Sequence, residues 1–161
     1  MNLKNTGIYA GVAAVVIILY SLWLWQPERQ VLKHHEHFLK AVSNRNWTRF
    51  AGFLDDKYTD RWGHDRAGVL SDSREVLSQF FTLTLTGEST DCAVDGNTGT
   101  VSCRLRMQGA GTPVAESAVS EVNSLAAPFT FKWTRQSWKP WDWKLMSVDN
   151  PQLNIPQGAG Y

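Results

Sequence analysis

Tyr58 and Asp60 are the residues of this sequence whose types and spacing come closest to a catalytic pair. Abstraction of a proton from a carbon atom needs a carboxylate base that faces a proton donor inside a dry pocket. Side chains two positions apart in a β-strand point to the same face, so the Asp60 carboxylate and the Tyr58 hydroxyl could face one substrate. No motif fixes either residue, and a solvated position of Asp60 in a loop is the competing interpretation.

The segment HHEH, residues 34–37, offers two further kinds of chemistry. His35 follows the apolar stripe of a predicted helix, where it is either an acid or base at a pocket wall or a hydrogen-bonded core histidine. His34 and His37 are helical neighbours and could hold one ion, but no third ligand follows at zinc-site spacing and the HExxH motif is absent. We therefore predict no metal and no cofactor. If the chain is an enzyme, its predicted catalytic residues are Asp60, His35 and Tyr58.

The charge of the chain argues against one class of partner. The sequence has 161 residues, enough for one domain, with sixteen basic and fifteen acidic side chains. Only Lys4 precedes residue 28, so the segment 28–161 carries fifteen charges of each sign. A neutral domain gives no electrostatic reason to bind nucleic acid, and no such partner is predicted.

An uncharged run near the N-terminus, Gly7 to Trp25, is long enough to cross a membrane. As a helix it would reach about 28 Å, close to the thickness of the hydrocarbon layer. A cleaved signal peptide would end in small residues, whereas this run ends in aromatic ones that suit the membrane–water interface, namely Tyr20, Trp23 and Trp25. We predict a short tail over 1–6 and a retained single transmembrane helix over 7–26.

The two cysteines bear on the side of the membrane where the domain lies. Positive charges around the run slightly favour the cytoplasm, but long domains cross largely regardless of charge. The turn signal 95–99 predicts a β-hairpin, and pairing Val94 with Val101 places Cys92 opposite Cys103, with Cα atoms ~4.5 Å apart. A disulfide is then feasible, and two buried thiols are the alternative. We interpret the domain as periplasmic or otherwise extracytoplasmic, at the cell membrane.

Apolar residues at helical spacing predict three helices in the first half of the domain. The first covers 28–45, and the second covers 46–54 with Asn46 as its N-cap. The third begins near Asp65 and restarts at Asp72, where Glu75 completes a capping-box spacing.

From Phe81 onward the period of the apolar residues changes to two. Apolar and polar side chains alternate in three runs, residues 81–86, 101–108 and 129–134. Such alternation is typical of an antiparallel sheet with one packed face. We predict an α+β domain over 27–150, in which residues 115–127 form a short helix or an irregular crossover, followed by a flexible tail over 151–161.

Helices followed by an antiparallel meander with a tryptophan-rich end resemble the nuclear transport factor 2-like (NTF2-like) superfamily. The likeness is carried by the first predicted helix, NRNWTRFAGFLDDKYTDRWG (44–63), the hairpin and FKWTRQSWKPWDWKL (131–145). It implies a bent sheet that wraps the helices into a cone, whose interior is a filled core or a pocket. The superfamily includes ketosteroid isomerase-like enzymes, dehydratases, polyketide cyclases and non-catalytic assembly modules. A membrane span before this fold is also similar in layout to a bitopic periplasmic component of type IV secretion machines.

The tryptophans near the C-terminus divide into two groups. In a strand, Trp141 and Trp143 share a face with Leu145, and we expect Trp143 to pack inside the sheet. Trp138 and Trp141 flank Pro140 at a turn and are expected to be partly exposed. Residues that could line a pocket in the cone are Phe38, Tyr58, Trp62, Trp133 and Trp143.

Two functions follow from these features. The first is a non-catalytic, membrane-anchored module that docks on another membrane or envelope protein, with a homodimer as a further possibility. Its predicted partner surface consists of Arg104, Arg106, Trp138 and Trp141. The alternative is a small-molecule binder or an isomerase- or dehydratase-like enzyme that acts in the cone. Tethering favours the first function, whereas a cavity of ~300 Å³ or more with converging polar groups would favour the second.

Overall fold

The structure is a computed structural model that describes residues 11–16 and 26–154. Residues 11–16 are helical. Within the described ranges, no helix is both long enough and apolar enough to cross a membrane. Most of the predicted span 7–26 lies outside those ranges.

Three helices open the domain. Helix α2 (Pro27–Ser43) begins at a proline, whose fixed φ suits a first helical position. Helix α3 (Trp47–Phe53) is capped by Asn46, whose side chain accepts a hydrogen bond from the Arg49 N–H at 3.1 Å, as predicted. Helix α4 (Arg66–Ser78) is capped by Asp65, which accepts from the Gly68 N–H at 2.8 Å. The predicted restart at Asp72 is wrong, because this single cap starts one helix that continues through that residue.

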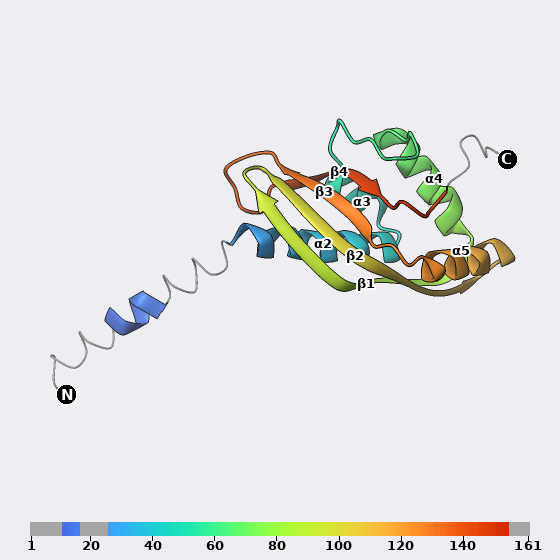
Figure 1. The fold of residues 1–161 in the computed structure, drawn as a ribbon, viewed down its shortest axis with the longest axis horizontal. Coiled ribbons are helices and arrows are strands. Elements are labelled where there is room, and N and C mark those ends of the chain that lie inside the picture. The colour runs from blue at the N-terminus through green and yellow to red at the C-terminus, as the bar shows by residue number, and fades with distance from the viewer. Residues whose placement is uncertain (1–10, 17–25, 155–161) are drawn as a thin grey trace.

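The second half of the domain is a sheet of four antiparallel strands in the order β1-β2-β3-β4. The strands are β1 (Phe80–Asp95), β2 (Thr98–Gly111), β3 (Phe129–Arg135) and β4 (Trp143–Asp149). Helix α5 (Pro113–Ser124) connects β2 to β3, so the helical reading of this stretch is confirmed. Helix α2 lies along one face of the curved sheet, and α4 and α5 lie toward the end away from the start of α2 (Figure 1). The predicted α+β architecture is confirmed.

The core lies between α2 and the sheet, and one glycine permits their close approach. A Cβ atom on Gly99 of β2 would lie 2.8 Å from the Val31 side chain of α2, which is closer than real Cβ contacts. Val31 is fully buried, and so are Trp133 of β3 and, to within 2% exposure, Trp143 of β4. The packed position expected for Trp143 is therefore confirmed. Trp141 lies outside β4, so the two tryptophans do not share a strand face.

The predicted hairpin register is wrong by two residues. Asp95 pairs with Thr98, which leaves a loop of only Gly96 and Asn97, and Gly96 supplies the positive φ that so short a loop needs. Cys92 consequently faces Val101, and both cysteines are free thiols. The register of β1 shifts between Glu88 and Asp91, so Cys103 of β2 is not paired with a residue of that strand. The predicted disulfide is not formed, and the argument for an oxidising compartment loses its support.

Candidate functional site

A cavity of about 310 Å³ lies between the helices and the sheet. Apolar side chains from several elements form most of its wall, among them Phe38 of α2, Phe50 of α3, Val69 of α4, Leu105 of β2 and Leu145 of β4. Polar groups enter the wall from one loop and from α4, namely Tyr58, Asp60, Trp62, His64, Asp72 and Ser73. The cavity thus combines an apolar interior with a localised set of groups that can exchange protons.

The loop before α4 places these polar groups by its backbone. The Thr59 N–H donates to the Met146 carbonyl of β4 at 3.0 Å, which fixes the loop to the sheet. The Asp60 N–H donates to the His64 carbonyl at 3.2 Å, and Gly63 adopts a positive φ of 88° between them. The loop therefore folds back on itself, and the side chains of Asp60 and His64 come together.

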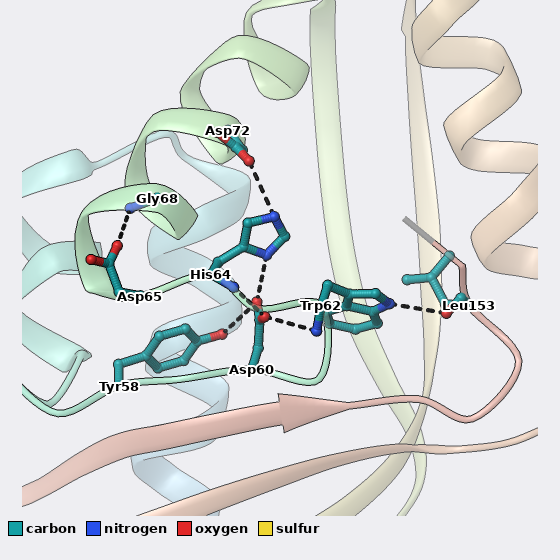
Figure 2. A network of polar contacts seen from close by, with 8 residues as sticks. All are labelled: Tyr58, Asp60, Trp62, His64, Asp65, Gly68, Asp72 and Leu153. Carbon is teal, nitrogen blue, oxygen red and sulfur yellow. Dashed lines mark hydrogen bonds and ion pairs between the residues drawn. The ribbon is translucent and has the colours of Figure 1, made fainter. Parts of the chain in front are cut away.

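Asp60 is the centre of the polar network. One carboxylate oxygen accepts from the Trp62 and His64 N–H groups at 3.0 and 2.9 Å. The other lies 2.8 Å from His64 Nδ1 and 3.5 Å from the Tyr58 hydroxyl (Figure 2). The side chain is only 2% exposed, so Asp60 is not the solvated loop residue of the competing interpretation. Four hydrogen-bond donors therefore surround one buried carboxylate.

His64 links this buried carboxylate to the cavity. A protonated Nδ1 donates to this oxygen of Asp60, and in the neutral ring that tautomer leaves Nε2 as the acceptor. The other ring nitrogen, Nε2, lies 3.2 Å from an oxygen of Asp72 on α4 (Figure 2). The His64 side chain is 19% exposed and that of Asp72 is 57% exposed, so the network runs from the interior to the surface. His64 lines the cavity, and Nε2, which faces the more exposed of the two carboxylates, is the nitrogen available to accept or donate a proton.

Tyr58 supplies a neutral hydroxyl beside Asp60. Burial raises the pKa of Tyr58 above its ordinary value, and the charge and hydrogen bond of Asp60 raise it further. The hydroxyl therefore stays protonated at neutral pH and acts as a donor. The pairing of Tyr58 with Asp60 in space agrees with the sequence prediction.

His35 does not join this group. His35 is 2% exposed, and its ring meets the ring of Phe131 edge to face with centroids 4.5 Å apart. Its Nε2 lies 3.4 Å from the Cys103 sulfur. Its Nδ1 has no hydrogen-bond partner among the described residues. His35 is absent from the cavity wall, where the structure instead places His64, so grouping His35 with Asp60 was wrong.

Three of the five predicted pocket residues line the cavity, and two do not. Phe38, Tyr58 and Trp62 lie in its wall, whereas Trp133 and Trp143 are packed into the core. Sequence reasoning missed His64 and Asp72. The available signal was the segment DRWGHD, residues 60–65, in which a histidine follows a carboxylate by four positions just before a helix cap.

The four residues of the predicted partner surface fall into two groups. Trp138 and Trp141 are exposed, at 78% and 58%. The Arg104 guanidinium donates to the Ala126 carbonyl at 3.0 Å, and Arg106 pairs with Glu88 at 3.1 Å. Both arginines are thus engaged by their own chain, which leaves the two tryptophans as the open part of that surface.

A metal does not suit the polar network. Over the described part of the chain, no group of three or more histidine, cysteine or acidic residues could hold an ion. The reason at His64 is geometric, because its two nitrogens point away from each other, one to Asp60 and one to Asp72 (Figure 2). The two carboxylates therefore flank the ring and do not converge on a common point.

Comparison with known proteins identifies the fold. A proposed dehydratase of the NTF2-like family from Streptomyces avermitilis is 18% identical, with a TM-score of 0.56 over 76% of this chain and 93% of that one. A proposed aromatic ring hydroxylase from Novosphingobium aromaticivorans is 10% identical, with a TM-score of 0.58 over 75% and 85%. Bd1075 from Bdellovibrio bacteriovorus is 12% identical, with a TM-score of 0.58 over 75% of this chain but only 39% of its own length.

These similarities show that the chain has the NTF2-like fold, as the sequence resemblance implied. No protein-family model and no curated protein matches the sequence. At these identities the similarity extends to the fold alone, so function has to be argued from the cavity and its side chains.

Proposed function

We propose that the domain is an enzyme that moves a proton on a small, mainly apolar substrate held in the cavity. The observation that carries this proposal is the Asp60–His64 pair, a buried carboxylate 2.8 Å from a histidine that lines the cavity. A cavity of about 310 Å³ is large enough for a compact ring compound. These features favour the enzymatic alternative over a docking module with a filled cone.

The arrangement supports a specific division of roles. With Nδ1–H donated to Asp60, the Nε2 lone pair of His64 takes a proton from the carbon next to a substrate carbonyl. The protonated imidazole is stabilised by Asp60 and then returns the proton, either to another carbon, which isomerises the substrate, or to a departing hydroxyl, which dehydrates it. Asp72, exposed at the surface end, gives up its contact with Nε2 when substrate enters. The fold shared with a proposed dehydratase agrees with this class of reaction.

Exchange of ketone protons with solvent deuterium tests the proposal without knowledge of the natural substrate. We would incubate the full chain with 2-tetralone and related bicyclic ketones in D2O and follow loss of the α-proton signals by NMR. The wild-type chain is expected to accelerate exchange, and His64→Gln to lose about 10²–10⁴-fold of that acceleration, the usual contribution of one acid–base group.

The matched control is His37→Gln, which changes an exposed histidine of α2 outside the cavity wall. It is expected to exchange like the wild type. Binding of these ketones without accelerated exchange would indicate that the cavity is a carrier site. If the ketones neither bind nor exchange faster than without the protein, the enzymatic proposal is contradicted.

We also propose that the uncharged run Gly7–Trp25 anchors the domain in a membrane, where the enzyme would meet apolar substrates. Protease protection tests on which side of the membrane the domain lies. Digestion of the domain in intact cells or spheroplasts supports the extracytoplasmic position predicted from the sequence. Digestion only after the membrane is opened would place the domain in the cytoplasm.

A further inference from the structure

Two exposed tryptophans stand out on the loop between β3 and β4. Trp138 and Trp141 are 78% and 58% exposed, while Trp133 and Trp143 on the adjoining strands are buried. Large aromatic side chains gain most from leaving water, so two of them exposed within four residues indicate a surface that is covered by something else.

The loop holds these side chains on a defined backbone. The Gln136 N–H donates to the Asp142 carbonyl at 2.8 Å, and the Asp142 N–H donates to the Lys139 carbonyl at 3.2 Å. The indole N–H of Trp143 donates to the Pro140 carbonyl at 3.0 Å, which ties the loop tip to the core. The exposure of the tryptophans is thus built into a hydrogen-bonded loop.

This loop lies at the end of the domain where the chain enters helix α2. The Arg135 N–H donates to the Asn97 carbonyl at 2.8 Å, so the end of β3, from which the loop leaves, lies beside the β1–β2 turn. The same hairpin contacts the first turn of α2, where the Cys92 sulfur lies 3.7 Å from the Glu28 carbonyl. Figure 1 shows the start of α2, the β1–β2 turn and the β3–β4 loop together at one end, opposite α5.

The sequence just before α2 indicates what lies next to this end of the domain. The run Gly7–Trp25 is uncharged and ends in the interface-type residues Trp23 and Trp25, two positions before Pro27 starts the helix. The polar layer of a bilayer extends only about 5–7 Å beyond the hydrocarbon on each side. A domain joined by so short a connection keeps this end within reach of that layer.

We propose that the β3–β4 loop docks on the phospholipid bilayer that residues 7–25 enter, with Trp138 and Trp141 in the headgroup layer and the exposed Lys139 beside lipid phosphates. The loop thereby gives the domain a second point of attachment and a fixed orientation. This inference rests on the membrane anchoring proposed above and is independent of the chemistry of the cavity.

Depth-dependent quenching of a fluorophore tests the proposal. The full chain with Lys139→Cys, labelled with the environment-sensitive dye NBD, is reconstituted in vesicles of about three parts phosphatidylcholine to one part phosphatidylglycerol, with and without spin-labelled lipid. The control carries Glu121→Cys on α5 at the opposite end, and the unsubstituted chain gives the background from Cys92 and Cys103. A third chain adds Trp138→Ser and Trp141→Ser to Lys139→Cys.

Spin-labelled lipid is expected to quench the dye at residue 139 by about twofold or more, and the dye at residue 121 hardly at all. Replacement of both tryptophans should return residue 139 to the level of residue 121 while the chain stays with the vesicles. Equal quenching at the two labelled positions would overturn the proposal, and so would a chain that does not associate with vesicles. A change of the residue 139 signal with protein concentration in detergent would overturn it in favour of a second copy.

Discussion

His35 and His64 are two sheltered histidines of one domain, and their surroundings give them opposite properties. His35 faces Cys103 and aromatic rings, where burial lowers the pKa of His35 to about 4 and raises the pKa of Cys103 to about 11. Both groups are therefore neutral at pH 7, and the pair has no thiolate with which to react. His64 instead lies between two carboxylates at a cavity wall.

These surroundings distinguish a histidine that only packs in the core from a histidine that can transfer a proton. A histidine on the apolar stripe of a helix is surrounded by side chains that disfavour its charge, so its proton is not exchanged near neutral pH. A histidine in a polar loop can carry a proton through a reaction cycle when a buried carboxylate orients one nitrogen and only an exposed carboxylate, here that of Asp72, meets the other. The orienting carboxylate, more than burial, distinguishes the two sites.

Replacement of that carboxylate is expected to have the largest effect. In Asp60→Asn the amide can donate to His64 Nδ1, which shifts the ring proton to Nε2 and removes the base from the cavity wall. Ketone exchange should fall by about 10²–10⁴-fold, measured as for His64→Gln. The matched control is Asp56→Asn, because the Asp56 side chain is 97% exposed in the same stretch. Equal activity of the two variants would remove the role assigned to Asp60.

Acidification is expected to destabilise the folded chain through His35. Its pKa is about 4 in the folded chain against 6.5 when exposed, so the unfolded chain binds more protons between these values. Its contribution to stability is therefore complete above pH 6.5 and is lost as the pH falls through about 4. The 2.5-unit difference corresponds to a loss of about 3 kcal/mol in the free energy of unfolding.

Urea unfolding of wild type, His35→Leu and His37→Leu between pH 7 and 4 measures this loss. The His35→Leu chain should lose about 3 kcal/mol less than the wild type over that range, because its buried site no longer takes up a proton on unfolding. The His37→Leu chain, changed at an exposed position, should follow the wild type. Parallel curves for all three chains would contradict the buried, neutral state of His35.

Tyr58→Phe is expected to have the smallest effect. The Tyr58 hydroxyl lies 3.5 Å from Asp60, at the outer limit of a hydrogen bond, and the carboxylate keeps its three shorter contacts without it. We expect less than about a tenfold change in ketone exchange and a loss of about 1 kcal/mol in stability. A loss as large as that of His64→Gln would make Tyr58 the proton donor to the substrate.

Local patterns were enough to predict most of the fold. The stripe of α2, the Asn46 cap and the alternation in the strands each depend on residues near one another in the chain. The hairpin register was missed because it follows from a two-residue loop at Gly96, whereas the pattern also allowed a longer one. One helix cap at Asp65 likewise replaced two predicted starts.

The candidate site was predicted only in part, because it depends on tertiary folding. Tyr58 and Asp60 were found from their types and spacing, but the choice of His35 as their partner assumed that a histidine facing the core also faces the pocket. The loop that folds His64 onto Asp60 depends on Gly63 and on a contact with β4, and Asp72 arrives from the next helix. The volume of the cavity has no signature in the sequence.

NMR of the histidine ring nitrogens during addition of 2-tetralone tests the central claim most directly. With ¹⁵N-labelled full chain at neutral pH, neutral His64 is predicted to carry its proton on Nδ1, and its Nε2 signal to shift as the ketone enters the cavity. The signals of His35, which lies outside the cavity wall, are predicted to stay unchanged. A neutral His64 protonated on Nε2, or a ketone-dependent shift at His35 with none at His64, would contradict the assignment of His64 as the proton-transfer residue.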